Sequence, residues 1–171
     1  MSTFGNFLNF EPLITVMSKK LLNISLFAWA TVVLLLPSCT PGSCFEETNA
    51  YVKATFCLES SRKADAPDSL TLFGIGRDTS TIYSKSRNLS QALIPLDAST
   101  EGCGFVIKIN GVYDTISFTY TTYLQMLSKD CGYTFYHTID IPVYTTNIID
   151  TVTIVKSSIT TLSEENIRIY Y

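Results

Sequence analysis

Five cysteines are the residues of this chain whose type and spacing bear most directly on chemistry. Cys39 follows a long apolar run, whereas Cys44, Cys57, Cys103 and Cys131 are spread along the rest of the chain. A cysteine thiol can form a disulfide, bind a metal, attack a substrate or accept a lipid. Because no two of these cysteines have the close C-x2-C spacing of structural zinc sites, we predict no metal site at them.

The residues before Cys39 have the three-part pattern of an export signal. Lys19 and Lys20 provide a basic start, residues 21–36 form an apolar core, and the small Ser38 precedes the cysteine. A membrane-spanning helix needs about 18 to 20 unbroken apolar residues, and three polar residues interrupt this core. We therefore predict a signal helix that is cleaved.

The end of this segment resembles the lipobox of bacterial lipoproteins, with Leu36 three positions before Cys39 and Ser38 immediately before it. The resemblance implies that the Cys39 thiol is alkylated with diacylglycerol and becomes the new N-terminus. An ordinary secretory signal or a short membrane anchor is the alternative. Met17 is a more natural initiator than Met1, because residues 1–16 carry no cation.

These features predict three parts: an upstream extension plus signal peptide at 1–38, a lipidated tether at 39–49, and one folded domain at 50–171. Removing 38 of the 171 residues leaves 133, the size of a single domain. The tether is short, so the domain stays near its membrane. Some surface-exported lipoproteins carry an acidic run directly after the lipidated cysteine. Here a polar segment stands in that place, which favours a location of the protein on the periplasmic face of the outer membrane.

Charge and cysteine number limit the partners and the redox state of the domain. Without Lys19, Lys20 and Glu11, twelve basic residues become ten and fifteen acidic residues become fourteen, a net charge of −4. The scattered cations argue against nucleic acid as a partner. With Cys39 assigned to lipid, four cysteines remain in an oxidising compartment. They predict two disulfides, for which three connectivities are open.

His137 is the only histidine, which excludes mechanisms that need two. It shares its strand parity with Phe135 and Ile139, so we expect a partly buried, hydrogen-bonded side chain. No G-x-S-x-G nucleophile motif occurs. We predict no catalytic residue and no enzymatic activity. A hydrolase is the alternative, since a pair of acids for glycosidase chemistry meets only in the fold.

The remaining candidate groups are carboxylates and tyrosines. The carboxylates lie mostly at expected turns, where such side chains cap the backbone, and no D-x-D-x-D-G calcium loop occurs. We therefore predict no metal and no cofactor. The tyrosine side chains could stack on sugars or fill a protein interface. Most of them are explained by the high β-propensity of tyrosine and by packing in the core. They are Tyr113, Tyr120, Tyr123, Tyr133, Tyr136, Tyr144, Tyr170 and Tyr171.

Three tripeptides that begin at Asp68, Asp114 and Asp150 have an Asp, then Ser or Thr, then an apolar residue. They resemble the acceptor motif of a Bacteroidetes O-glycosylation system. The resemblance implies modification at Ser69, Thr115 and Thr151. Chance matches to so short a motif are expected in a chain rich in Ser and Thr.

The elements that must position these residues are β-strands. Apolar residues alternate in 50–58, 70–73, 89–96, 105–109, 112–120, 135–141, 152–154 and 167–171. Asn110-Gly111 predicts a type I′ hairpin turn, and Pro95 predicts a sheet edge. Only residues 123–129 fit a helical turn. We predict an all-β domain, a single β-sandwich of immunoglobulin-like or similar type with seven to nine short, mostly antiparallel strands.

The closing segments resemble those of an uncharacterised family of Bacteroidetes β-rich lipoproteins. The segments are Cys131-Gly132-Tyr133, residues 149–154 and residues 164–171, and residues 93–96 and 114–120 fit the same outline. Cys44 and Cys131 belong to the shared pattern and Cys57 and Cys103 do not. The resemblance therefore implies the pairs Cys44–Cys131 and Cys57–Cys103. The family has no established activity and supplies no catalytic residue.

Together these features predict a lipid-anchored cell-envelope protein of unknown activity, a non-catalytic scaffold or accessory subunit. Its predicted partners are the membrane, through the lipid on Cys39, and an envelope protein. A β-sandwich that binds a ligand or glycan is the alternative, motivated by the tyrosines.

Overall fold

The computed structural model describes residues 44–76 and 80–171. These residues form eleven β-strands and no helix, and so contain no helix long and apolar enough to cross a membrane. The strands are β1 (Tyr51–Cys57), β2 (Leu70–Gly74), β3 (Thr81–Ser86), β4 (Gln91–Pro95), β5 (Gly102–Ile109), β6 (Val112–Ser128), β7 (Gly132–Ile139), β8 (Val143–Tyr144), β9 (Thr151–Ile154), β10 (Ser158–Ile159) and β11 (Ile167–Tyr170).

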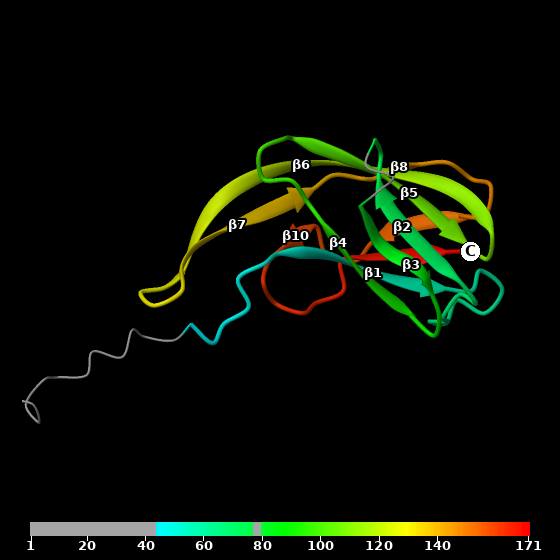
Figure 1. Cartoon of the computed structure of the whole chain (residues 1–171), viewed down its shortest axis with the longest axis horizontal. Coiled ribbons are helices and arrows are strands. Elements are labelled where there is room, and N and C mark those ends of the chain that lie inside the picture. The colour runs from blue at the N-terminus through cyan, green and yellow to red at the C-terminus, as the bar shows by residue number, and fades with distance from the viewer. Residues whose placement is uncertain (1–43, 77–79) are drawn as a thin grey trace, which may run out of the picture. The chain divides into compact units, whose positions relative to one another are not determined.

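The strands form two sheets (Figure 1). The smaller sheet has the order β4-β1-β11-β9, in which β1 and β11 are parallel and the other neighbours are antiparallel. The larger sheet has the order β10-β7-β6-β5-β2-β3, with β8 paired beside β6. Long β6 joins its two halves, because residues 112–119 pair with β5 and residues 120–128 pair with β7.

One hydrophobic core lies between the sheets, because alternate residues of both sheets point inward. Val52, Ala54 and Phe56 of β1 are buried together with Ile116, Phe118 and Tyr120 of β6. The buried set also includes residues of β2, β4, β5, β7, β9 and β11. The all-β prediction is confirmed, and a core shared by two sheets is the arrangement of a β-sandwich.

Local sequence signals explain several boundaries. Asn110 and Gly111 have φ values of 50° and 94°, as a type I′ hairpin between β5 and β6 requires. Pro95 ends β4, an edge strand of the smaller sheet. The strand number exceeds the predicted seven to nine because the two-residue strands β8 and β10 are too short to leave a sequence pattern.

The expected helical turn at residues 123–129 is wrong. Residues 120–126 pair one by one with residues 139–133 of β7, so β6 continues as a strand to Ser128. Cross-strand hydrogen bonds over the whole segment outweigh the weak helical pattern of a few residues.

Candidate functional site

The second half of β6 and the facing strand β7 form an arm, defined here as residues 121–138. Leu124 pairs with Phe135 and Met126 with Tyr133. The arm ends in a tight turn, in which Gly132 adopts a φ of 72° that favours glycine. Figure 1 shows the two strands running past β4 and β1 to this turn.

A disulfide between Cys44 and Cys131 ties the N-terminal leader, residues 44–50, to the tip of the arm. The two Cα atoms are 4.8 Å apart, within the range that a disulfide bridges. Nearer the domain, the Thr134 hydroxyl donates a 2.5 Å hydrogen bond to the Thr48 carbonyl. This disulfide agrees with the predicted pair, and it fixes where the leader meets the fold.

One side of the arm carries an exposed set of apolar side chains, which we name the apolar arm face. Its members are Leu124 (58% exposed), Met126 (46%), Tyr133 (64%) and Phe135 (47%). Directly opposed residues of antiparallel strands share a face, so the four side chains are adjacent. The helical pattern of residues 123–129 hid this face, because Thr122 and Tyr123 interrupt the alternation that runs from Ile116 to Tyr120.

His137 lies at the root of the arm and is 3% exposed. Its Nδ1 is 2.9 Å from the Thr122 hydroxyl, and its ring packs edge-on against Tyr120. Burial lowers the pKa of His137, so the ring is neutral near pH 7. The expected hydrogen-bonded histidine is confirmed, and the ring is more fully buried than the expected partly buried side chain.

The predicted Cys57–Cys103 disulfide is wrong, because both residues are free thiols. Cys57 is at the end of β1, whereas Cys103 contacts Tyr120, whose hydroxyl donates to the Asp97 carbonyl two residues after Pro95. Pro95 pairs with Tyr51, at the start of β1. The six residues from Tyr51 to Cys57 span about 20 Å of strand, too far for a disulfide.

Cysteine alkylation without prior reduction is expected to modify Cys57 and Cys103 once the protein is unfolded, and Cys44 and Cys131 only after reduction. In the folded protein both free thiols should react slowly, because burial raises the pKa of each. Peptide mass analysis after alkylation checks this. Protection of Cys57 and Cys103 in the unfolded, unreduced protein would contradict the free thiols.

A hollow of about 540 Å³ lies beside the β4–β5 connection, and Cys103 lines it together with Ile75, Leu96 and Phe105. The thiol is the most nucleophilic group of this lining, but it is protonated near pH 7 because burial raises its pKa. Asp97 also lines the hollow, and its carboxylate accepts hydrogen bonds from the backbone and hydroxyl of Ser99. The hollow thus has a mixed polar and apolar lining, and its thiol is not activated.

Asp114 is a buried carboxylate, but its contacts belong to the fold. One oxygen accepts hydrogen bonds from the Thr145 hydroxyl and the Asn147 amide, and the other accepts from the amides of Ile148 and Ile149. These bonds hold the segment before β9 against β6. Among residues 44–76 and 80–171, no group of three or more His, Cys, Asp or Glu side chains could hold a metal ion.

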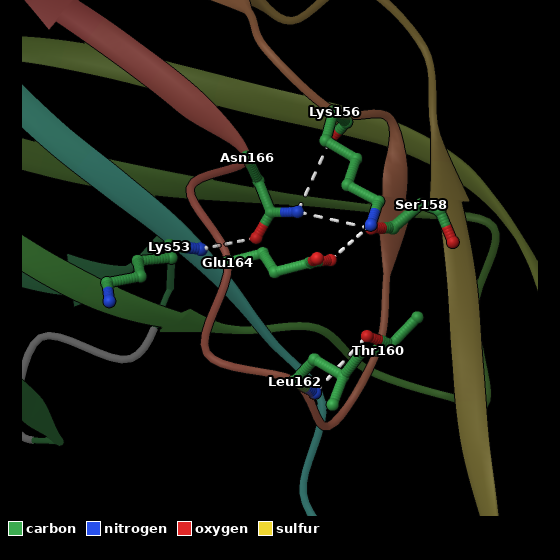
Figure 2. A network of polar contacts seen from close by, with 7 residues as sticks. All are labelled: Lys53, Lys156, Ser158, Thr160, Leu162, Glu164 and Asn166. Atoms are coloured by element: carbon green, nitrogen blue, oxygen red, sulfur yellow. Dashed lines mark hydrogen bonds and ion pairs between the residues drawn. The ribbon is translucent and has the colours of Figure 1, made fainter.

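Asn166 is a second buried polar residue, at the centre of the network in Figure 2. Its side-chain oxygen accepts a 2.9 Å bond from the Lys53 amide, and its nitrogen donates to the carbonyls of Lys156 and Ser158. An ion pair between Lys156 and Glu164 lies beside it. The amide joins β1 to the segments around β10, and its contacts belong to the fold.

The tyrosines divide between the two roles that the sequence left open. Tyr120 and Tyr170 are buried, which fits core filling. Tyr113, Tyr123 and Tyr133 are exposed on β6 and β7. Exposed tyrosines thus lie at both ends of β6 rather than on one platform.

The three predicted glycosylation residues are all partly exposed. Ser69 precedes β2, Thr115 lies within β6, and Thr151 begins β9. Their modification stays a prediction. Cys39, Met17 and the signal segment lie outside the described residues.

Comparisons with known proteins place the domain in a family but give no activity. Residues 69–171 match the model of a family of unknown function, DUF6452. The match includes the arm, Cys103 and Cys131, and it begins after β1 and the leader. No curated protein and no solved structure matches the chain. The match covers more than half of the chain, which therefore belongs to the family of unknown function DUF6452.

Proposed function

We propose that this chain is a lipid-anchored protein of the cell envelope that works through contacts with other molecules, as a scaffold or accessory subunit. The observation that carries the proposal is the Cys44–Cys131 disulfide. Disulfides persist in oxidising compartments, which agrees with the export signal before Cys39. The lipid would hold the domain on the periplasmic face of the outer membrane.

The chemistry of the domain supports a role without catalysis. The ring of His137 is buried and neutral, the Cys103 thiol is protonated, and the Asp114 carboxylate is occupied by four hydrogen bonds. A catalytic group needs access to a substrate and a pKa matched to its task. These three side chains contribute to packing and loop positioning instead.

Lipid attachment is tested by growing bacteria that express the full chain with an alkyne-tagged fatty acid. Wild type is expected to incorporate the tag, and Cys39→Ala to lose it. Cys103→Ala is the matched control, since it removes a thiol of the folded domain and should retain full labelling. Equal labelling of wild type and Cys39→Ala, or none in either, would reject the lipid anchor.

A further inference from the structure

The apolar arm face continues the core-facing side of the larger sheet past the ends of β1 and β4, where Phe135 lines a hollow together with Tyr51 and Pro95. On β6 this side carries Phe118 and Tyr120, which are buried, and then Leu124 and Met126, which are exposed. On β7 it runs from buried Ile139 and His137 to exposed Phe135 and Tyr133. The same strand faces thus change from core to surface along their length, without a change to polar residues at the exposed end.

The opposite side of the arm is more polar, although it also carries Tyr123, Tyr136 and the half-buried Leu127. Thr121, Gln125 and Thr138 are exposed there, and Thr134 shares this side. Tyr123 and Tyr136 pack edge to face on it, and the Tyr136 hydroxyl contacts Thr161. The arm is therefore an amphipathic two-stranded ribbon. One side suits an apolar environment, and the other suits water.

The leader places this ribbon close to the lipid of the proposed function. Four residues lie between Cys39 and Cys44, and the five steps from one to the other reach at most about 17 Å in an extended chain. Cys44 is bonded to Cys131 at the tip of the arm. A diacylglyceryl group on Cys39 therefore holds the arm tip within that distance of the bilayer surface. Phe45, next to the bonded cysteine, is 93% exposed.

We propose that the apolar arm face lies on the lipid bilayer that carries the Cys39 anchor. The face contains no charged residue, so its affinity comes from burial of Leu124, Met126, Tyr133 and Phe135 and is independent of headgroup charge. Tyr133 combines an apolar ring with a hydroxyl, which suits the boundary between headgroups and acyl chains. Lipid and arm then hold the domain at two points, and its orientation on the membrane is fixed.

The inference rests on the proposed function, and a fluorescence experiment separates the two. The only tryptophan, Trp29, precedes Cys39, and cleavage of the proposed signal would remove it. Phe135→Trp therefore places a single reporter on the apolar arm face, and Tyr123→Trp places the matched control on the polar side of the same ribbon. Each protein is expressed as the full chain, purified from membranes, weighed intact to establish its lipid state, and reconstituted in phosphatidylcholine vesicles with tail-brominated lipid.

The reporter at position 135 is expected to be quenched by the brominated tails at least about threefold more than the reporter at position 123. Equal quenching in a protein whose mass includes the lipid would overturn the inference and leave the anchor intact. Strong quenching at position 135 without lipid mass would support the face and reject the anchor. A blue-shifted reporter at position 135 that lipid does not quench would overturn the inference in favour of a second copy or a protein partner.

Discussion

Replacing Asp114 with asparagine is expected to lower the free energy of unfolding by about 3 kcal/mol, because an amide cannot accept all the bonds that the carboxylate accepts. Asp114 is 2% exposed, and its carboxylate accepts hydrogen bonds from the backbone amides of Asn147, Ile148 and Ile149. In Asp114→Asn the side-chain NH2 faces at least one of these donors, which is left buried without an acceptor. Urea unfolding followed by circular dichroism measures the loss.

The charge of Asp114 adds a pH dependence to this result. Burial on its own raises the pKa of Asp114, but the bonds from Thr145 and from the three backbone amides outweigh it and lower the pKa. Stability from a depressed carboxyl pKa is present above the unfolded value of about 3.9 and is lost as the pH falls through the folded value. The difference between wild type and Asp114→Asn should therefore shrink below about pH 4.

Asp140→Asn is the matched control, because Asp140 is exposed at the end of β7. A surface substitution of this kind should change the free energy of unfolding by less than about 0.5 kcal/mol. A loss in Asp114→Asn no larger than that of the control would show that the segment before β9 is held by other contacts. A difference from wild type that stays constant through acid would show that geometry, and not charge, carries the effect.

Removal of the Cys44–Cys131 disulfide in a Cys44→Ser, Cys131→Ser double variant is expected to cost about 3 kcal/mol of unfolding free energy. The bond closes a separation of 87 residues. For a loop of this size the chain-entropy model gives about 4–5 kcal/mol. The folded leader also gains freedom when the bond is absent, which offsets part of that loss.

Urea unfolding of wild type and the double variant, each with and without reductant, measures the effect. Reductant should bring wild type to the stability of the double variant and leave the variant unchanged. If wild type without reductant unfolds at the same urea concentration as the variant, the leader contributes nothing to the fold through this bond. The attachment of the leader to the arm would then make no difference to the stability of the domain.

Short-range signals made the strands and the hairpin predictable from the sequence. The alternation of Val52, Ala54 and Phe56 needs only local side-chain periodicity, and Asn110-Gly111 needs only the φ preferences of two residues. Such signals remain valid in any all-β arrangement. The sheet order and the two free thiols depend on contacts between distant segments, which no local pattern encodes.

The arm shows where local reasoning failed. Residues 123–129 fit a helical turn by sequence, but the pairing of residues 120–128 with β7 makes them part of a strand. Exposure of Leu124 and Phe135 depends on where the smaller sheet ends, which is a property of β1 and β4. A period-two pattern shows which residues share one face of a strand. It does not show whether that face is buried or exposed.

The parallel pairing of β1 with β11 also constrains how the protein can be made. In the smaller sheet β11 lies between β1 and β9, and residues 54–57 find their partners in residues 167–170. A chain is synthesised from its N-terminal end, so β1 leaves the ribosome before β11 has been made. Contacts of such long sequence separation form late, so the smaller sheet is completed only after residues 167–170 have emerged. Until then β1 is an apolar strand with one open edge, and a chaperone that binds unfolded chains would prevent its aggregation.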